Sequence, residues 1–542
     1  MSPRAPLGPS RYDPTGRRRP TSERWDIRRL NPPNRLWGSN GVTFGPDGRL
    51  YAAQFIAGQI SAVDPASGDV EVVVGLDGPV QAPDDLAFGA DGSMYIADLT
   101  PNRVWRRDPG GEFSLVSDTV QVPNGITCVG DRLFVNEMKT DGRLLELFPD
   151  GGDPVVLTGG LALGNAMQLG PDGCLYYPHM ISNEVWRIPA DGGSPELVAA
   201  GVHDPVAVRF DKGGTLVVLS RGVAGIVTRI DLATGVRTTV TSGVAGLDNA
   251  AFDAENRMYV SSFASGGVTE MHPDGRTREI VPRGLDGPFG IAVDLGGTVY
   301  AADHYRLARL TGTGADEPGG ATHALLQFAH AVTADDGLLH LTSQQGEVRT
   351  HDPHTDTTRV RATGLSEPSG LAVAPDGALV VAETGAGRVV RIDATDTLTV
   401  LAEGLDHPMD IAFDGRGRCY VSDDRLGAVL QIGPGDGELT TLAEGLGAPQ
   451  GLAVRGEDLF TVEVAHRRLR AIGLTTSDSR IEAEDLAVGL PPGSTRAHPE
   501  QAPAYTSPPH QFAGLAVSHD GTLLLSANGE GTVLRLTERP ER

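Results

Sequence analysis

Five side chains able to bind a metal ion lie at multiples of about forty residues along the first half of the chain. They are Asn40, Asp84, Asn124, Asn165 and Asp248. Amide and carboxylate oxygens are the ligands that hard cations such as Ca²⁺ prefer, with Mg²⁺ and Mn²⁺ as alternatives. Two carboxylates brought together repel each other unless a cation lies between them. If the fold gathers these residues, we expect one divalent cation among them.

Three positions carry groups suited to proton transfer. Asp248 fits the role of a base that takes a proton, with His179 or Glu137 as the acid partner. A structural role is the alternative for both partners, since a single histidine is often a structural residue. Acidic residues recur at the position of Glu137 throughout the chain, which favours a carboxylate that caps the following turn. These further residues are Asp98, Asp303, Glu383, Asp423 and Glu463.

The spacing arises from an internal repeat. The segments 41–51 (GVTFGPDGRLY) and 370–380 (GLAVAPDGALV) are two copies of one phrase, in which an Asp-Gly pair separates two apolar runs. Asp-Gly between such runs is a strong hairpin signal, because glycine accepts a positive φ. Four short strands in about forty residues are typical of one β-propeller blade. The copies begin at positions 41, 85, 125, 166, 207, 249, 290, 331, 370, 410, 451 and 514.

Twelve blades exceed the four to eight that one ring holds, so the sequence predicts an all-β protein of two tandem six-bladed propellers. A seven-plus-five division is the less symmetric alternative. We expect each ring to be closed by its own N-terminal outer strand, namely 25–30 for the first ring and 277–281 for the second. The predicted divisions are a disordered arm over 1–22, propeller 1 over 23–274, and propeller 2 over 275–542 with an inserted loop at 489–511.

The propeller prediction explains why the five metal-binding candidates meet. In a blade, the residue that opens the innermost strand lies beside the axis, and the five candidates hold this position in five blades of the first ring. Water in the tunnel is the alternative occupant, since Asn and Asp also open strands for reasons of turn geometry. A second, weaker pocket is conceivable in the other ring, where His330 and Gln450 lie at the axis with Asp303 and His304 nearby. The openers of the second ring are Phe289, His330, Ser369, Met409, Gln450 and Ala513.

Composition narrows the class of partner. The formal net charge is −25, and Lys139 and Lys212 are the only lysines. This acidic balance disfavours nucleic acid, which is bound by clustered cationic side chains. The first thirty residues lack the apolar stretch of a signal peptide, no run is long enough for a membrane helix, and the three cysteines are scattered. We therefore expect a cytoplasmic protein with reduced thiols, no membrane contact and a small-molecule substrate.

The chain resembles the NHL-type six-bladed propellers, in particular the gluconolactonase and regucalcin-like family, with strictosidine synthase more distant. Pro123-Asn124-Gly125-Ile126 is similar to the Asn-Gly motif of that family, and Asn165 and Asp248 match a second amide and a late-blade Asp. The resemblance implies an axial Ca²⁺ held by a Glu, two Asn and an Asp that also acts as general base. The chain departs from this set because Asn40 replaces the first-blade Glu, and Asp84 supplies a carboxylate one blade later.

The predicted function is that of a metal-dependent enzyme acting on a small organic substrate at the axial mouth of the first ring. Lactone or ester hydrolysis is what the family resemblance implies. A lyase, isomerase or cyclase of specialised metabolism on the same metal site is an alternative. A non-catalytic binding or scaffold protein, with water in both tunnels, is the other alternative, because propellers serve many functions.

Overall fold

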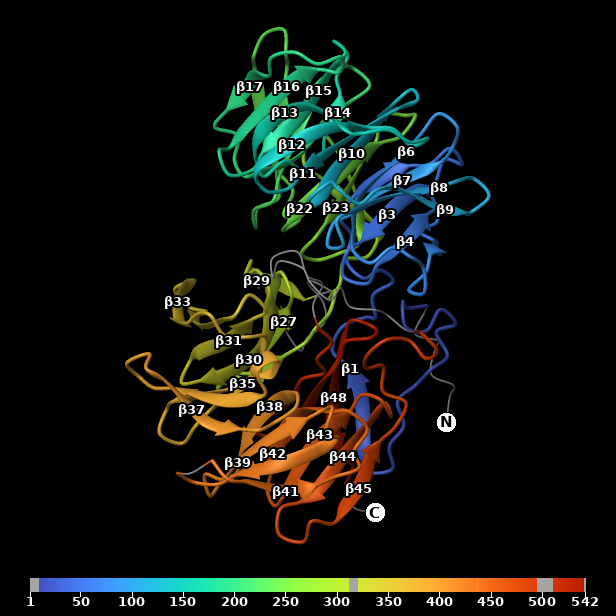
Figure 1. Ribbon diagram of the computed structural model, residues 1–542. Coiled ribbons are helices and arrows are strands. Elements are labelled where there is room, and N and C mark those ends of the chain that lie inside the picture. Colours follow the sequence, from blue (N-terminus) through green and yellow to red (C-terminus); the bar gives the residue numbers. More distant parts are fainter. Residues whose placement is uncertain (1–8, 311–319, 436, 495–509, 541–542) are drawn as a thin grey trace. The chain divides into compact units, whose positions relative to one another are not determined.

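The computed structural model describes residues 9–310, 320–435, 437–494 and 510–540, and the description below concerns these residues. They form twelve four-stranded antiparallel sheets (Figure 1). The one helical element among them is a short 3₁₀ helix, η1 (Thr384–Ala386). No helix in the described part is long and apolar enough to cross a membrane. The prediction of an all-β fold is confirmed.

The first ring occupies Arg35–Arg283. Each of its six sheets consists of four consecutive strands. The innermost strands contact one another in order, and the first, β2, also contacts the last, β22, so that the ring closes. Its strands are β2 (Val42–Phe44), β3 (Leu50–Gln54), β4 (Gln59–Val63), β5 (Val70–Val74), β6 (Pro83–Phe88), β7 (Met94–Asp98), β8 (Arg103–Arg107), β9 (Phe113–Ser117), β10 (Pro123–Val129), β11 (Arg132–Glu137), β12 (Thr140–Leu147), β13 (Val155–Ala162), β14 (Gln168–Leu169), β15 (Cys174–His179), β16 (Glu184–Pro189), β17 (Glu196–Ala200), β18 (Pro205–Phe210), β19 (Leu216–Ser220), β20 (Ile226–Ile230), β21 (Arg237–Thr241), β22 (Leu247–Phe252), β23 (Met258–Ser262), β24 (Val268–Met271) and β25 (Thr277–Val281).

The second ring comprises Gly284–Gly493 together with the described residues of 1–34 and 509–542. Its innermost strands likewise contact one another in order, from β26 round to β46 and back to β26. Its strands are β26 (Ile291–Val293), β27 (Val299–Asp303), β28 (Arg306–Leu310), β29 (Ala321–Ala324), β30 (Ala329–Asp335), β31 (Leu338–Ser343), β32 (Glu347–Asp352), β33 (Thr357–Ala362), β34 (Pro368–Val373), β35 (Leu379–Glu383), β36 (Arg388–Ile392), β37 (Leu398–Glu403), β38 (Pro408–Phe413), β39 (Cys419–Asp423), β40 (Ala428–Ile432), β41 (Leu439–Ala443), β42 (Pro449–Arg455), β43 (Asp458–Glu463), β44 (Arg468–Gly473), β45 (Ser479–Ala483), β46 (Leu515–Val517), β47 (Leu523–Ala527), β48 (Thr532–Glu538) and β1 (Trp25–Arg29).

The two ends of the chain share the last sheet of the second ring, whose order is β1-β48-β47-β46. Figure 1 shows β1, in blue, beside β48, in red. Trp25 pairs with Glu538 in this register. The indole of Trp25 is fully buried, donates from Nε1 to Glu482 Oε2 at 2.7 Å, and packs edge-on against Phe460.

The predicted mode of closure is therefore wrong for both rings. The strand at 25–30 completes the last sheet of the second ring, whereas β25 pairs with β24 and completes the sixth sheet of the first. The repeating unit thus places its outer strand last, and the missing outer strand of the final blade comes from the start of the chain. The compact units divide between Arg283 and Gly284 rather than near Asp274.

The N-terminal arm, predicted to be disordered over 1–22, is ordered where the structure describes it. Tyr12 and Asp13 are buried, and the Arg11 guanidinium donates to the carbonyls of Asn528 at 2.8 Å and Leu285 at 3.2 Å. Thr21 forms an antiparallel bridge with Glu484. The arm therefore packs on the second ring. Most of the predicted inserted loop at 489–511 lies outside the described residues.

Apolar residues of adjacent sheets pack face to face and form the core of each ring. Ile60 and Val74 of one blade, for example, belong to the same buried cluster as Leu86 and Ile96 of the next. The Asp-Gly hairpins turn as predicted, and Gly48 has a φ of +78°. This packing holds the six inner strands of each ring at its axis and so positions the residues that open them.

Candidate functional site

The five predicted metal ligands open the inner strands of five blades in the first ring, and all of them are at least 93% buried. Asn40 Nδ2 donates to Asp84 Oδ1 at 3.3 Å. Asn124 also forms a side-chain hydrogen bond with Asp84, and Asp84 and Asp248 interact electrostatically. The fold therefore brings Asp84 together with Asn40, Asn124 and Asp248.

The two carboxyl groups of this set are difficult to ionise in the protein alone. Burial and the neighbouring charge of Asp85 raise the pKa of Asp84 to about 7, against a hydrogen bond from Asn124. Burial and the charges of Asp84 and Asp85 likewise raise the pKa of Asp248 well above its ordinary value, and Arg209 opposes this. Such a pair of carboxyl groups is stabilised in its ionised form by an added positive charge.

One amide oxygen in the set is buried without a partner. Asn124 Oδ1 accepts no hydrogen bond from the described residues, while its Nδ2 lies 3.1 Å from Met138 Sδ. Asn165 differs, because its Oδ1 accepts from the Ala166 N–H at 2.6 Å and its Nδ2 faces Met180 Sδ at 3.4 Å. Asn165 therefore lies at the site but turns its oxygen toward its own strand.

The donor set fits a hard divalent cation by its chemistry. Two carboxylates and several amides supply oxygen atoms, and a buried oxygen with no partner is a group that a ligand would satisfy. No group of three His, Cys, Asp or Glu side chains close enough to hold a metal occurs in the described part of the chain. A cation at this site would therefore depend on amide oxygens as much as on carboxylates.

Sequence reasoning missed a second layer of polar residues, which lies further along the inner strands than the five predicted ligands. Asp85 Oδ1 accepts from Asn249 Nδ2 at 3.0 Å, and Arg209 lies 4.0 Å from Asp85 Oδ2. The Arg209 guanidinium also binds Asn249 Oδ1 and donates to the carbonyls of Ala250 at 2.8 Å and Met167 at 3.0 Å. The available signal was the doublets Asp84-Asp85 and Asp248-Asn249, because four blades of this ring carry Gly or Ala at the second position.

Glu137 makes structural contacts that conflict with its predicted role as an acid partner. Burial opposes ionisation of this carboxylate, but hydrogen bonds from the Arg143 side chain at 2.5 and 3.0 Å and from the Gln121 N–H at 2.9 Å lower its pKa. A carboxylate held in its ionised form has no proton to donate at neutral pH. The alternative structural reading of Glu137 agrees with this geometry.

The contact of Glu137 with Gln121 recurs around both rings. The side chain that ends the second strand accepts a backbone N–H from the loop that precedes the first strand of the same blade. The turn into the third strand, which the sequence suggested as the partner, is not the common feature. The further carboxylates that accept such an N–H are Asp98 (from Ala82), Asp303 (from Gly287), Glu383 (from Ser366), Asp423 (from His407) and Glu463 (from Gly447).

His179 does not make this contact. Its imidazole stacks on Trp186 with ring centroids 5.5 Å apart, and its Nε2 is buried with no partner among the described residues. Burial lowers the pKa of His179, so the ring is neutral at pH 7 and suited to accept rather than to donate a proton. The following residue, Met180, contacts Asn165, which places His179 beside the axial set.

The second pocket suggested by the sequence is filled by side chains at the axial face. His330 stacks between Phe289 and Phe512, with both centroid distances at 5.4 Å. His330 Nε2 contacts the His510 carbonyl at 3.1 Å, and Gln450 binds the Ala513 N–H. His304 is fully buried. These residues pack against one another rather than converging on open space.

Comparisons with known proteins find a partial sequence relationship. No family model matches the chain. Part of the chain is related to gluconolactonase. A gluconolactonase from Zymomonas mobilis is 30% identical over an alignment of 118 residues, and the match covers 18% of this chain and 33% of that protein. The chain thus matches about a third of the length of this relative.

Three solved structures also resemble the chain. A streptogramin B lyase is 20% identical over 52% of this chain and 95% of its own, with a TM-score of 0.38. A gluconolactonase from Xanthomonas campestris is 17% identical over 48% and 96%, with a TM-score of 0.38. A calcium-binding regucalcin from Agrobacterium tumefaciens is 20% identical over 45% and 86%, with a TM-score of 0.36.

Proposed function

We propose that the first ring binds one divalent cation, Ca²⁺ by preference, at its axial face and hydrolyses a lactone or ester of a small organic molecule. The observation that carries this proposal is the buried set of Asp84, Asp248, Asn40 and Asn124, in which two carboxyl groups meet and one amide oxygen lacks a partner. The partial relationship to gluconolactonase supports the choice of reaction.

The chain supplies three functions in this proposal. Asp84, Asp248 and the oxygens of Asn40 and Asn124 would hold the cation, with Asn165 joining if its amide turns. When bound, the cation supplies a Lewis acid that polarises the substrate carbonyl or acidifies a water molecule. Asp248 accepts the proton of the attacking water and returns it to the alkoxide that leaves when the ring C–O bond breaks. His179, neutral and unpartnered at Nε2, accepts a hydrogen bond from a substrate hydroxyl.

The decisive experiment separates cation binding from turnover. The protein is purified without chelator, its metal content is measured by mass spectrometry, and Ca²⁺ binding is followed by calorimetry. Hydrolysis of glucono-δ-lactone and other aldonolactones is then followed by pH-stat. We expect about one cation per chain, and loss of both binding and turnover in Asp248→Asn and Asp84→Asn. Asp153→Asn removes one exposed charge of the same ring and serves as the control.

Each result has a distinct meaning. If the wild type binds the cation, Asp248→Asn does not, and no lactone is hydrolysed, the metal site is correct but the reaction is not. A lyase, isomerase or cyclase reaction would then be tested. Full cation binding in both axial variants would refute the site. A protein that binds neither cation nor lactone would be a binding or scaffold module with solvent along its axis.

A further inference from the structure

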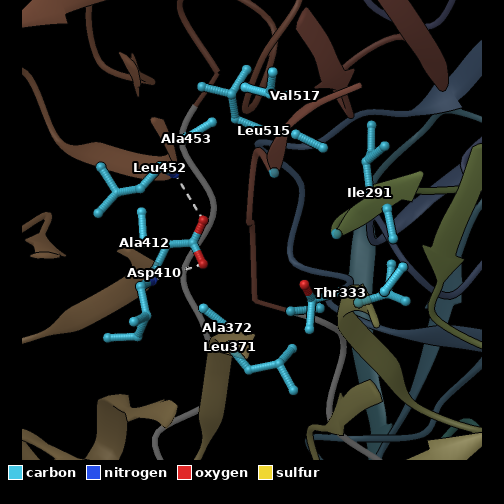
Figure 2. A pocket seen from close by; sticks show the side chains of 18 of the residues that line it. Ile291, Thr333, Leu371, Ala372, Asp410, Ala412, Leu452, Ala453, Leu515 and Val517 are labelled. Atoms are coloured by element: carbon cyan, nitrogen blue, oxygen red, sulfur yellow. Dashed lines mark hydrogen bonds between the residues drawn. The ribbon is translucent and has the colours of Figure 1, made fainter. Parts of the chain in front are cut away.

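The axis of the second ring contains a cavity of about 240 Å³ (Figure 2). The inner strands of all six blades line it, and its walls are mainly alanine, valine, leucine and isoleucine. Among the described residues, only Asp410 and Thr333 contribute side-chain oxygens to the lining. Figure 2 shows the carboxylate of Asp410 among the aliphatic side chains of the lining. None of these residues belongs to the site proposed in the first ring.

The cavity opens toward the hairpin end of the inner strands. At the axial face it is closed by the stack of Phe289, His330 and Phe512, each at most 4% exposed. Lining residues toward the other end, such as Val454 and Val517, are half-buried. The cavity is therefore a funnel that is blind at the axial face, and Asp410 lies in its buried part.

Asp410 is a buried acid with no ionic partner. Its oxygens accept the N–H groups of Ile411 at 2.9 Å and Leu452 at 2.8 Å, and it forms no ion pair within the described residues. A carboxylate oxygen accepts more than one hydrogen bond, so both oxygens retain capacity for a donor in the cavity. Burial without a compensating charge raises the pKa of Asp410 to about 7.

The first ring shows what such a carboxylate is paired with. Asp85 occupies the same place in its blade, one residue after the strand opener, and the guanidinium of Arg209 lies 4.0 Å from it. Arg209 is the third residue after the opener Val206, on the third blade after that of Asp85. The third blade after that of Asp410 opens at Phe289, and the third residue after this opener is Ala292. The cationic side chain of the first ring is thus replaced by a methyl group. The layer of the second ring at this height consists of Ala292, Thr333, Ala372, Ala412, Ala453 and Ala516.

The backbone around the cavity also has acceptors that match those used by Arg209. In the first ring the guanidinium donates to the carbonyls of Met167, Val208 and Ala250, each two residues after its strand opener. These carbonyls lie on the second, third and fourth blades after that of Asp85, and the same steps from Asp410 lead to the carbonyls at 515, 291 and 332. Within the described residues no side chain donates to any of these three carbonyls. The second ring thus has the carboxylate and equivalent carbonyl positions, but lacks the cation.

We propose that this funnel binds a small organic cation, a guanidinium or primary ammonium group on a short alkyl chain, that enters from the hairpin end and pairs with Asp410. The cation takes the place that the Arg209 guanidinium has in the first ring. Its N–H groups donate to the Asp410 carboxylate and to the ring of carbonyls, and its alkyl chain contacts the alanine and valine walls. Asp410 is buried, and charge pairing in such a buried position is stronger than in bulk water.

Calorimetric titration of the full chain tests this proposal with defined probes. Methylguanidinium and n-propylguanidinium are compared with n-propylammonium, with tetramethylammonium, which lacks N–H donors, and with neutral n-propylurea. We expect saturable binding of n-propylguanidinium or n-propylammonium, and at least tenfold weaker binding of the other two classes. The better of the two bound probes identifies the cationic group.

Two variants link binding to the funnel. Asp410→Asn should weaken binding at least tenfold, whereas Asp478→Asn, which removes an exposed charge of the same ring, should not. Ala292→Arg should place a guanidinium in the cavity, abolish binding and leave the fold intact as judged by circular dichroism. Equal affinity of wild type and Asp410→Asn, or equal binding of n-propylurea, would overturn the proposal. Crystals soaked in n-propylguanidinium that show only solvent beside Asp410 would do the same, whether or not Ala292→Arg folds.

Discussion

Asp85 in the first ring and Asp410 in the second accept the same two backbone hydrogen bonds. Each accepts the N–H of its own following residue, Leu86 or Ile411, at 2.9 Å. Each also accepts an N–H from the inner strand of the next blade, at 3.3 Å for Asp85 and 2.8 Å for Asp410. Both carboxylates therefore join neighbouring blades at the axis.

The rings differ in what compensates this buried charge. Asp85 is also bound by Asn249 and lies near Arg209, and its pKa is raised by burial to about 6, with Arg209 opposing the rise. Within the described part of the chain, Asp410 accepts hydrogen bonds only from backbone N–H groups, and burial raises its pKa to about 7. Polar side chains occupy the axis of the first ring, whereas a cavity surrounds Asp410 at the axis of the second.

The pH dependence of stability should reveal Asp410. Its pKa in the folded protein exceeds the ordinary value of 3.8, so the folded state binds the proton more tightly than the unfolded state. The resulting stabilisation is complete below the unfolded pKa and is lost as pH rises through about 7. Between pH 5 and 8 this loss is on the order of 3 kcal/mol for a single carboxyl.

Urea unfolding of wild type and Asp410→Asn at pH 5 and pH 8 measures this contribution. The variant should show a smaller loss of stability over this interval, since the asparagine does not titrate, while other carboxyl groups act equally in both proteins. Asp478→Asn should follow wild type. An identical loss in wild type and Asp410→Asn would contradict the raised pKa.

Trp25 should stabilise the second ring and not the first. Its indole is buried, donates to Glu482 of β45 and packs on Phe460 of β43, so Trp25→Ala removes a large side chain from a filled site. Such truncations typically cost about 3–5 kcal/mol. Hydrogen exchange followed by mass spectrometry should show faster exchange in β45–β48, with β2–β25 unchanged. Equal acceleration in both rings would contradict the closure of the last sheet by β1.

This closure shows what the repeat could not reveal. The hairpin phrase, with its Asp-Gly turn, predicts twelve blades and the residues that open their inner strands, because strand order within a blade follows directly from the chain. The outer strand lies between two successive copies of the phrase and is equally compatible with either. Only the pairing of β1 with β48 and of β25 with β24 decides this point.

The candidate site was likewise predictable only in the part that follows the repeat. Asn40, Asp84, Asn124, Asn165 and Asp248 stand out because their positions repeat and their side chains share one chemistry. Arg209 has no equivalent in other blades and lies within a strand, so neither periodicity nor a motif marks it. Its function depends on reaching carbonyls of two neighbouring blades, which is a property of the closed ring.

Glu137 should contribute to stability and not to the affinity for a cation. Glu137→Gln weakens the hydrogen bonds to Arg143 and Gln121, and Arg143 remains partly solvated, so we expect a loss of about 1–3 kcal/mol in the free energy of unfolding. Calorimetric Ca²⁺ affinity should stay within about twofold of wild type. A tenfold loss of Ca²⁺ affinity, as expected for Asp84→Asn, would show instead that Glu137 contributes to the cation site.

Removal of Arg209 should turn the first ring into a counterpart of the second. Arg209→Ala deletes the guanidinium that opposes the charge of Asp85 and leaves several inner-strand carbonyls without a donor. Loss of one partner from a buried charge pair typically costs about 3–5 kcal/mol. The variant should unfold at lower temperature, and Arg209→Met, which restores the volume but not the charge, should recover only part of the loss.

Millimolar methylguanidinium should then restore stability to Arg209→Ala, because it supplies the missing group to a space of the right shape. The measurement is thermal unfolding with and without methylguanidinium, with n-propylurea as the neutral control. Arg209→Ala and the protein that keeps Arg209 are both measured in an Asp410→Asn background, so that binding in the second ring makes no contribution. A rise in the unfolding temperature of Arg209→Ala that wild-type Arg209 does not show would establish that an axial carboxylate of this fold selects a guanidinium. No difference between the cation and the urea would indicate that Arg209 acts by filling space alone.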